Sequence, residues 1–208
     1  MNTVLSTFAR QCVAAIGVLL ALTVILGGAY PAVVWAASRL DTHAAEGTQA
    51  IDQRGCAAGS SNIGIDPKPA AGQPDSFLHA RVLGSDDDPM APGDPSASAA
   101  SNQGPGSESL ATEIDARRKV IASREGVAPA AVPVDAVTGS GSGLDPDISP
   151  AYAHLQVPRI AANSGRTPAQ VQAVIDEHTD GRQWGFLGQP RVNVLEVNLA
   201  LGHTVCHS

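Results

Sequence analysis

The sequence predicts an α+β protein, in which a single N-terminal transmembrane helix precedes one small mixed α/β domain outside the cytoplasm. Three patterns carry this prediction. An uncharged apolar run separates Arg10 from Arg39, a helical pattern occupies residues 109–125, and a strand-like pattern lies at residues 191–201. At 208 residues the chain accommodates one domain with additional segments.

The apolar run is long enough to cross a bilayer as a helix, which takes roughly 20 residues. We expect this transmembrane helix at residues 12–36. Tyr30 and Trp35 stand where aromatic residues occupy a membrane interface. A cleaved signal peptide is the alternative, because Ala36 and Ala37 supply small residues near a plausible cleavage site. The run is longer than the apolar core of such peptides, which favours an uncleaved anchor.

The charges around the span indicate its orientation. Arg10 and the terminal amine precede it, whereas Arg39 and two acidic residues follow it. Because basic residues are enriched on the cytoplasmic side, we expect a cytoplasmic N-terminus at residues 1–11 and an external domain at residues 37–208. Lipid would cover most of the span, but small residues would let a partner helix approach closely. These small residues are Gly17, Ala21, Gly27 and Gly28.

The composition excludes some classes of function. A net charge of −7 and a pI near 5.2 argue against nucleic-acid binding, which needs a basic surface. Aromatic residues make up only 3% of the chain, so we expect a core of Val, Leu, Ile and Ala. Cys12 lies in the apolar run, and Cys56 and Cys206 are expected to be free thiols rather than a disulfide.

Residues 132–150 are the most distinctive stretch. Residues 132–138 are rich in valine and predict a short edge strand, since Pro133 cannot donate to a ladder. Alternating glycine and serine residues then predict a tight turn, and Ser149 with Pro150 predicts a helix start. The turn is either a simple connection or a ligand surface of backbone N–H groups. It is no Walker phosphate loop, because no lysine follows its last glycine.

The segments before this stretch alternate between irregular and regular structure. Residues 76–83 predict a strand with imperfect alternation, and residues 84–106 predict a flexible loop with few apolar residues. The acidic triplet at 86–88 lacks the spacing of a calcium loop and is expected to be solvated. Residues 109–125 predict a helix, which carries the basic triplet 117–119 on a solvated face and ends at a glycine.

The C-terminal third predicts two helical regions and a strand. Residues 151–156 are helical, and Pro158 is expected to break this helix, which can restart through Arg159, Ile160 and Asn163 before Gly165. Thr167 and Gln170 form a capping box that starts an amphipathic helix, expected to end at a glycine, Gly181. Residues 191–201 have the branched side chains and alternation of a strand.

No set of residues predicts catalysis or a metal centre. His178 is adjacent to two carboxylates, Glu177 and Asp180, but no nucleophile accompanies them, so we expect a histidine that faces the core. Three possible ligands at the tail lack the further ligands of a zinc site: His203, Cys206 and His207.

Several motifs nevertheless occur together in this chain. The C-terminal half contains residues 132–150, Gln156-Val-Pro-Arg-Ile-Ala161, Glu177-His-Thr-Asp-Gly-Arg182 and residues 186–201. The N-terminal half adds Tyr30-Pro31 at the end of the span, residues 59–64 and residues 100–105. With these motifs the chain resembles the C subunit of the Kdp potassium-transporting P-type ATPase. It departs from that family where Val82 follows Leu78-His-Ala-Arg81, because the family usually has proline there.

The resemblance implies a non-catalytic accessory subunit in the inner membrane of a bacterium. Its partners would be a channel-like potassium-selective A subunit, an ATP-hydrolysing B subunit and a small F subunit. It would assist their assembly and raise the ATP affinity of the B subunit. The external domain would cap the potassium entrance, where its acidic field would concentrate cations. The alternative is a membrane-tethered external binding module that acts without the pump.

The resemblance also implies a nucleotide contact in the glycine–serine loop. The residues concerned are Ser140, Gly141, Ser142, Gly143, Leu144 and Asp145. The predicted topology opposes this contact, because it places the loop outside the cell, where ATP is scarce. We therefore expect no firmly bound cofactor, and ATP only through the complex.

Overall fold

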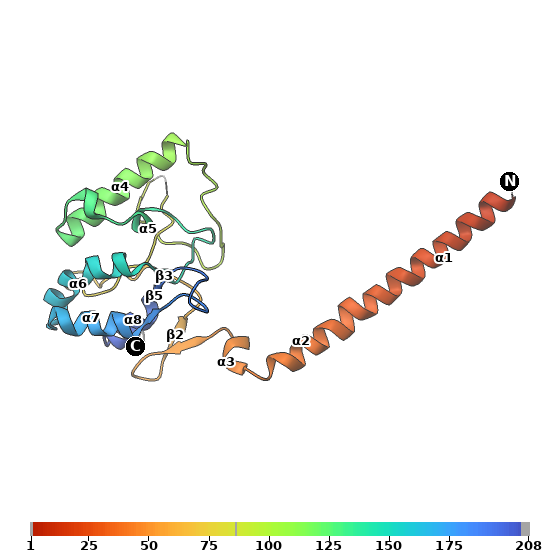
Figure 1. Ribbon diagram of the computed structural model, residues 1–208, viewed down its shortest axis with the longest axis horizontal. Coiled ribbons are helices and arrows are strands. Elements are labelled where there is room, and N and C mark those ends of the chain that lie inside the picture. Colours follow the sequence, from red (N-terminus) through yellow and green to blue (C-terminus); the bar gives the residue numbers. More distant parts are fainter. Residues whose placement is uncertain (1, 86, 205–208) are drawn as a thin grey trace. The chain divides into compact units, whose positions relative to one another are not determined.

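The computed structural model describes residues 2–85 and 87–204 (Figure 1). The chain forms two compact units, one that ends at Thr48 and one that begins at Gln49. The first consists of helices alone among its described residues, and the second is a mixed domain of helices and strands.

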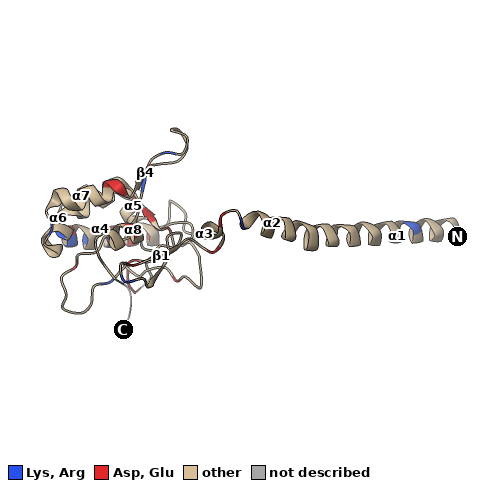
Figure 2. Ribbon diagram, turned by 90° about the horizontal axis from the view of Figure 1, so that it is seen from below, with Lys and Arg blue, Asp and Glu red and all other residues tan. Residues whose placement is uncertain are grey.

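One long apolar helix dominates the first unit. Its consecutive parts are α1 (Asn2–Val24), the π-helical turn η1 (Ile25–Ala29) and α2 (Tyr30–Ser38), and the short helix α3 (Thr42–Ala45) follows. Within the described residues, Thr3–Ser38 is the one helix long and apolar enough to span a membrane. Arg10 is its single charged residue and lies toward its N-terminal end, and Arg39 follows its last residue, so basic residues flank the apolar stretch (Figure 2). The helix predicted at residues 12–36 is therefore confirmed as a continuous apolar helix.

The second unit combines separate helices with two small antiparallel sheets, which is the α+β class that the sequence predicts. One sheet pairs β1 (Gln49–Ile51) with β2 (Ala57–Ser60). The other has the strand order β3-β5-β4, so the last strand of the chain lies in its middle. In chain order the remaining elements are α4 (Glu108–Glu125), the 3₁₀ turn η2 (Pro129–Ala131), α5 (Val134–Val137), β3 (Asp147–Ile148), α6 (Pro150–Ser164), α7 (Pro168–Glu177), β4 (Thr179–Asp180), β5 (Arg191–Asn193) and α8 (Val194–Ala200).

Helix α6 lies at the centre of the hydrophobic core. Its residues Tyr152, Ala153 and Ile160 have no exposed surface. They belong to one buried cluster with Val171 and Ile175 of α7 and with side chains from α4, β5 and α8. Among the described core residues Tyr152 is the single aromatic, which confirms the expectation of an aliphatic core.

The starts and ends of the helices follow the signals in the sequence. Ser149 caps α6, because its hydroxyl accepts a hydrogen bond from the Tyr152 N–H at 3.1 Å. Thr167 and Gln170 cap α7 reciprocally, which confirms the predicted capping box. Helix α4 ends at Gly126 in the left-handed conformation, as expected.

The strand predicted at residues 132–138 is wrong. Val134–Val137 form the helical turn α5, which begins directly after Pro133. Ala136 and Val137 are buried, whereas Val134 is 72% exposed. Proline suits the entry to a helical turn as well as an edge strand, so the sequence signal does not distinguish the two.

Most of the strand predicted at residues 191–201 is also wrong. Only the three residues of β5 join the sheet, and the Asn193 side chain then caps α8 by accepting a hydrogen bond from the Glu196 N–H. Val194, Val197 and Leu201 are buried at helical spacing. Over so short a run the apolar pattern fits a strand and a helix, and the asparagine cap favours the helix.

Two predicted helix ends differ from the structure. Helix α6 continues through Pro158, which removes the hydrogen bond to the carbonyl of His154. Both residues are exposed, so water can satisfy that carbonyl and the helix need not break. Helix α7 ends at Glu177 rather than at Gly181, because Thr179 already belongs to β4.

The predicted loop at residues 84–106 has no helix or strand in its described part. Asp87 and Asp88 are exposed, as expected for a solvated acidic run, and Asp86 lies outside the described residues.

The cysteines differ in state. Cys12 is a free cysteine in α1. Cys56 is disulfide-bonded, so the expectation of a free thiol is wrong for this residue. Sequence spacing carries no information about the distance between cysteines in a fold, so it could not decide between a free thiol and a disulfide. Cys206 lies outside the described residues.

Candidate functional site

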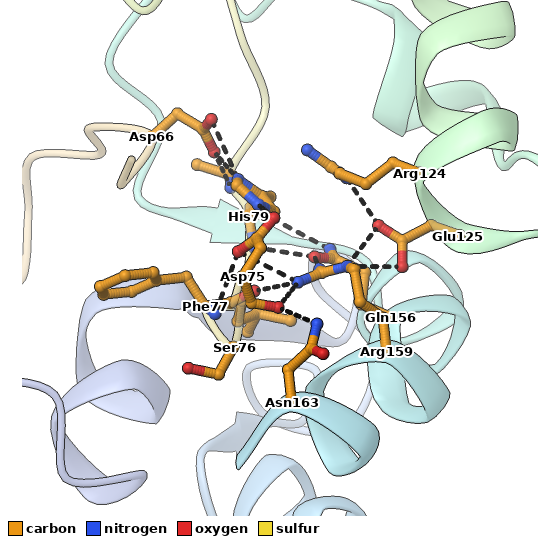
Figure 3. A network of polar contacts seen from close by, with 12 residues as sticks. Asp66, Asp75, Ser76, Phe77, His79, Arg124, Glu125, Gln156, Arg159 and Asn163 are labelled. Atoms are coloured by element: carbon orange, nitrogen blue, oxygen red, sulfur yellow. Dashed lines mark hydrogen bonds and ion pairs between the residues drawn. The ribbon is translucent and has the colours of Figure 1, made fainter. Parts of the chain in front are cut away.

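A buried extended segment, residues 76–83, is the centre of the polar contacts in the domain (Figure 3). Leu78, His79, Ala80 and Val82 are each at most 5% exposed. The strand predicted here is wrong, since the segment pairs with no strand in the described part of the chain. Its backbone N–H and C=O groups are buried and need other partners.

Side-chain amides take the place of a neighbouring strand. The carboxamide of Gln156 on α6 accepts a hydrogen bond from the His79 N–H at 2.8 Å and donates one to the His79 carbonyl at 3.1 Å. Asn198 on α8 makes the same two bonds to Leu78, both at 2.8 Å. Two helices therefore hold the segment through backbone contacts that do not depend on its side chains.

His79 lies between two carboxylates. Its Nδ1 is 3.1 Å from Asp66 and its Nε2 is 2.8 Å from Asp75. Burial lowers the pKa of His79, but the hydrogen bonds to the two carboxylates outweigh burial and raise that pKa above its ordinary value. Burial raises the pKa of Asp75, whereas the hydrogen bond to His79 and the charges of His79 and Arg159 lower it to about 2. His79 and Asp75 thus favour their charged forms together.

Arg159 connects this charged group to helix α4. Its guanidinium donates to the Glu125 carboxylate at 2.9 Å and to the carbonyls of Asp75 and Phe77 at 2.9 and 3.0 Å. The Glu125 side chain has no exposed surface, and a second cation, Arg124, donates to it at 2.7 Å. Two guanidinium partners compensate the burial of this carboxylate.

The basic triplet of α4 does not lie on one solvated face. Lys119 is exposed and Arg118 is partly exposed, but the Arg117 side chain is only 1% exposed. It pairs with Glu113 at 2.8 Å. It also donates to three backbone carbonyls, those of Leu83, Pro89 and Val137. The predicted solvated face is therefore wrong for Arg117. Its guanidinium donates hydrogen bonds to carbonyls of segments that belong to no sheet in the described structure.

The glycine–serine loop, residues 139–145, is tied at both ends by Arg81. The Arg81 guanidinium donates to the carbonyls of Thr138 and Gly139 at 3.1 and 2.9 Å and pairs with Asp145 at 2.9 Å. Gly143 has a φ of +71°, and a Cβ there would lie 2.6 Å from the Ala99 carbonyl oxygen. Glycine is therefore required at this position.

Two glycines from other segments pack directly on this loop. A Cβ on Gly64 would lie 2.0 Å from the Asp145 carbonyl oxygen, and one on Gly93 would lie 2.1 Å from the Gly143 carbonyl oxygen. The Gly64 N–H also bonds to the Leu144 carbonyl at 2.8 Å. Backbone meets backbone on this side of the loop, so no ligand can enter there.

The six residues predicted to contact a nucleotide, 140–145, are contiguous, but they differ in how far they are exposed. Residues 140–142 form a tip that reaches solvent, whereas Gly143 and Leu144 are buried. The N–H groups of these two residues bond to the Ser140 carbonyl and the Ser142 hydroxyl at 3.4 and 3.1 Å. Of the six residues only Asp145 lines a cavity of about 560 Å³, together with charged side chains of both signs that include Arg81, Asp135, Asp147 and Arg191.

The predicted packing residues of the membrane-type helix lie on two of its parts. Gly17 and Ala21 belong to α1, and Gly27 and Gly28 belong to η1. Gly17 and Ala21 are four residues apart and share one face. Within the described part of the chain, a Cβ on any of the three glycines would meet no atom within 4 Å. Another helix could therefore approach these positions closely.

The histidines of the C-terminal region serve local contacts. His178 caps α7, and its Nδ1 lies 3.6 Å from Glu196 on α8 rather than beside its chain neighbours. Its side chain is 26% exposed, so it faces the core only in part. His203 stacks on Phe77 with ring centroids 3.9 Å apart, and its Nε2 lies 3.0 Å from the Ser76 carbonyl oxygen.

The structure brings together no candidate metal ligands in the part that it describes. No group of three or more His, Cys, Asp or Glu residues among those residues could hold an ion. Of the three possible tail ligands, Cys206 and His207 lie outside the described residues.

Sequence analysis missed the side chains that hold the buried segment. These are Asp66, Gln156, Arg159 and Asn198. A signal was present, because Gln156 and Asn198 occupy helix positions that an apolar face would fill. Buried amides need specific partners, and these partners come from far along the chain.

The chain is similar to known proteins over nearly all of its length. The family model described as "KdpC: K+-transporting ATPase, c chain" matches residues 12–203. A protein named potassium-transporting ATPase KdpC subunit in Kineococcus radiotolerans is 42% identical, over 97% of this chain and 97% of its own length. Proteins with the same name in Variovorax paradoxus and Streptomyces avermitilis are 44% and 40% identical, over 86% and 100% of this chain and 89% and 100% of their own. The chain therefore belongs to the KdpC family, the c chains of K+-transporting ATPases.

Proposed function

We propose that this chain is a non-catalytic accessory subunit of an ATP-driven, high-affinity potassium uptake complex. The observation that carries the proposal is the family match over residues 12–203, which includes both the apolar helix and nearly all of the domain. The polar groups of the domain support a structural role. The Arg117 and Arg159 side chains are only 1% and 8% exposed and are bonded to backbone carbonyls and carboxylates of the same chain, so they are not open to a substrate.

In this proposal the helix crosses the bacterial inner membrane once, with residues 1–11 in the cytoplasm and the domain outside. Arg10 supports this orientation, because basic residues concentrate on the cytoplasmic side of a span. The disulfide-bonded Cys56 supports it independently, since such bonds persist in oxidising compartments.

The orientation is tested with a membrane-impermeant thiol reagent on intact spheroplasts. A Lys119→Cys variant should be labelled, because Lys119 is exposed on the domain. A Ser6→Cys variant should be labelled only after permeabilisation. The unsubstituted chain, whose free Cys12 lies in the apolar helix, gives the background. Labelling of position 6 but not of position 119 in intact spheroplasts would show the opposite orientation and contradict the proposed topology.

The proposed partners are a channel-like potassium-selective A subunit, an ATP-hydrolysing B subunit and a small F subunit. The open face with Gly17 and Ala21 would pack against a partner helix and thereby assist assembly. The domain would cap the potassium entrance, and its acidic field would raise the local cation concentration.

A tagged pull-down from detergent-solubilised membranes of potassium-starved cells tests the partnership. Recovery of a P-type ATPase and a channel-like subunit in stoichiometric amounts is the expected result. Recovery of this chain alone, from membranes that contain those subunits, would instead favour a tethered external module that acts without the pump.

A contact with ATP at the glycine–serine loop, and through it a raised ATP affinity of the B subunit, is the second candidate function. The observation that favours it is the cavity lined by Asp145 at the end of the loop, to which Arg81 and Arg191 contribute. Three carboxylates line the same cavity, so the ligand would be the magnesium complex. The full-length chain in detergent is expected to bind MgATP at equilibrium. The double variant Ser140→Ala with Ser142→Ala is expected to bind it more weakly. No binding at millimolar MgATP would remove this candidate.

A further inference from the structure

The connection between β4 and β5 forms a hairpin, residues 181–190, that lies entirely on the surface. All ten residues are exposed, whereas Val192, two positions after them, has no exposed surface. In Figure 2 the chain that follows β4 projects away from the helices of the domain.

The hairpin holds its own shape. Gln183 and Leu187 exchange two backbone hydrogen bonds at 2.9 and 3.0 Å, and the Gly185 N–H bonds to the Arg182 carbonyl at 3.1 Å. At its base the Arg191 guanidinium pairs with Asp180 at 2.7 Å and with Asp147 at 3.0 Å. Side chains at the tip therefore project from a fixed frame, which lowers the entropy cost of binding.

The tip of this hairpin is apolar. Trp184 is 84% exposed, Phe186 is 68% exposed and Leu187 is 42% exposed. The chain after Thr48 has only four aromatic residues, and two of them stand here rather than in the core. Clustered exposed apolar side chains mark interaction sites in soluble domains.

Trp184 is also held in an unusual backbone conformation. Its φ is +51°, a left-handed conformation that bulky residues rarely adopt. Glycines at 185 and 188 with φ values of +81° and +78° complete the turn around it. Such outliers concentrate at functional positions, which include active sites, ligand clamps and switch regions.

We infer that the hairpin at 181–190 docks into an apolar crevice on the water-exposed surface of a partner subunit, with Trp184 as the central contact; the inference rests on the proposed function. Tryptophan and arginine are enriched among the residues that dominate interface energies. Arg182 precedes Trp184 by two positions and makes no ion pair with any residue that the structure describes. A carboxylate at the rim of the partner's crevice would form an ion pair with the Arg182 guanidinium.

A lipid surface suits the hairpin less well than a protein crevice. The four charged residues up to Thr48 cancel, so the domain carries the whole net charge of −7. Anionic headgroups repel an acidic domain, and peptides that bind membranes through aromatic residues usually add a basic face. Arg182 is the single basic residue in the hairpin.

Photo-crosslinking in membranes tests the identity of the occupant. The full-length chain is co-produced with the other subunits and carries a photo-reactive phenylalanine analogue in place of Trp184. Irradiation is expected to give an adduct with a partner subunit. The same analogue in place of Val134, which is 72% exposed on the domain, serves as the control position. Adducts at position 184 with lipid alone, or no adduct above the control, would overturn the inference.

A matched pair of double variants measures the energetic contribution. Trp184→Ala with Phe186→Ala should raise the apparent dissociation constant for the rest of the complex about 30-fold, the effect of a central interface aromatic. The thermal midpoint of the chain should not change, because both side chains are exposed. Ile51→Ala with Val134→Ala removes equally exposed apolar groups and should leave the constant unchanged.

The outcomes separate this inference from the proposed function. If the hairpin variant co-purifies with partner subunits as well as the unsubstituted chain does, the docking hairpin is excluded and the accessory role stands. If the unsubstituted chain itself recovers no partner subunit, the accessory role is excluded, and the docking inference with it.

Discussion

The carboxamide of Gln156 bonds both backbone polar groups of His79, at 2.8 and 3.1 Å, across 77 positions of the chain. A neighbouring strand makes the same two-point contact in a ladder, so this side chain acts as a single residue of a strand. It fixes the buried segment 76–83 on helix α6. The segment ends near Arg81, which ties the two ends of the glycine–serine loop. The shape of that loop therefore depends on a contact in the core.

Replacement of Gln156 by leucine tests this dependence. The variant leaves a buried N–H and a buried C=O without partners, and each such group costs about 1–3 kcal/mol. We expect the free energy of unfolding to fall by about 2–5 kcal/mol in urea titrations of the full-length chain in detergent. Gln189→Leu, at an exposed position, is the control and should change little. Equal effects of the two substitutions would contradict a special role for Gln156.

The sequence predicted those parts of the fold that depend on neighbours in the chain. Ser149, Thr167 and Gly126 mark helix ends through bonds that span three or four residues, and all three predictions are confirmed. Where a short apolar run fits two periods, as at residues 191–201, local pattern was insufficient and an asparagine cap decided the outcome.

The candidate site was predictable only in part, because its contacts connect distant segments. Asn198 meets Leu78 across 120 positions, and Arg117 reaches the Leu83 carbonyl across 34. A periodic pattern marks Arg117 as a member of a helix face but does not say which carbonyls will meet it. The sequence located the glycine–serine loop, but it could not predict that Gly64 packs against the backbone of that loop.

His79 should make stability depend on pH. Its pKa is raised above 6.5 in the folded chain, so the folded state binds the proton more tightly than the unfolded state. The stabilisation is fully present below pH 6.5 and is lost as the pH rises through the raised pKa. The thermal midpoint of the unsubstituted chain should therefore fall toward that of His79→Gln as the pH increases.

Thermal unfolding of both chains over a pH series checks this expectation, since the difference between them isolates His79 from other titrating groups. A difference that stays constant across the series, or grows with pH, would show that the histidine is not held by Asp66 and Asp75 in its charged form.

Arg117 should be essential to the loops around α4. Arg117→Met leaves Glu113 and three backbone carbonyls without their cation, and loss of one partner of a buried ion pair costs about 3–5 kcal/mol. Hydrogen exchange at residues 87–91 should become faster, because the Pro89 carbonyl loses its donor. Arg118→Met removes the same charge from a partly exposed position and should stay within about 0.5 kcal/mol. Similar losses from both variants would indicate a general charge effect.

The glycine–serine loop should tolerate a methyl group on its tip but not one placed against its back. Gly64→Ala brings a Cβ to within 2.0 Å of the Asp145 carbonyl oxygen, and such overpacking costs about 1–3 kcal/mol. Gly141→Ala places its Cβ more than 4 Å from any described atom other than those of its own residue and its two chain neighbours, and it should be neutral or slightly stabilising. Unfolding titrations compare the two variants directly. An equal loss at both positions would mean that the loop is not packed as the structure has it.

The acidic run at 86–88 should affect potassium affinity if the domain caps a cation entrance. Asp87 and Asp88 are exposed, so their charges act through solvent, and neutralising all three residues should lower the apparent potassium affinity of the complex about fivefold at low ionic strength. The effect should shrink at physiological salt, where the Debye length is about 8 Å. Glu108→Gln, Asp176→Asn and Glu177→Gln together remove the same charge elsewhere on the domain and control for net charge. Potassium-stimulated ATPase activity gives the measurement. Equal shifts from both triple variants would assign the effect to overall charge, and no shift from either would count against a cation-concentrating domain.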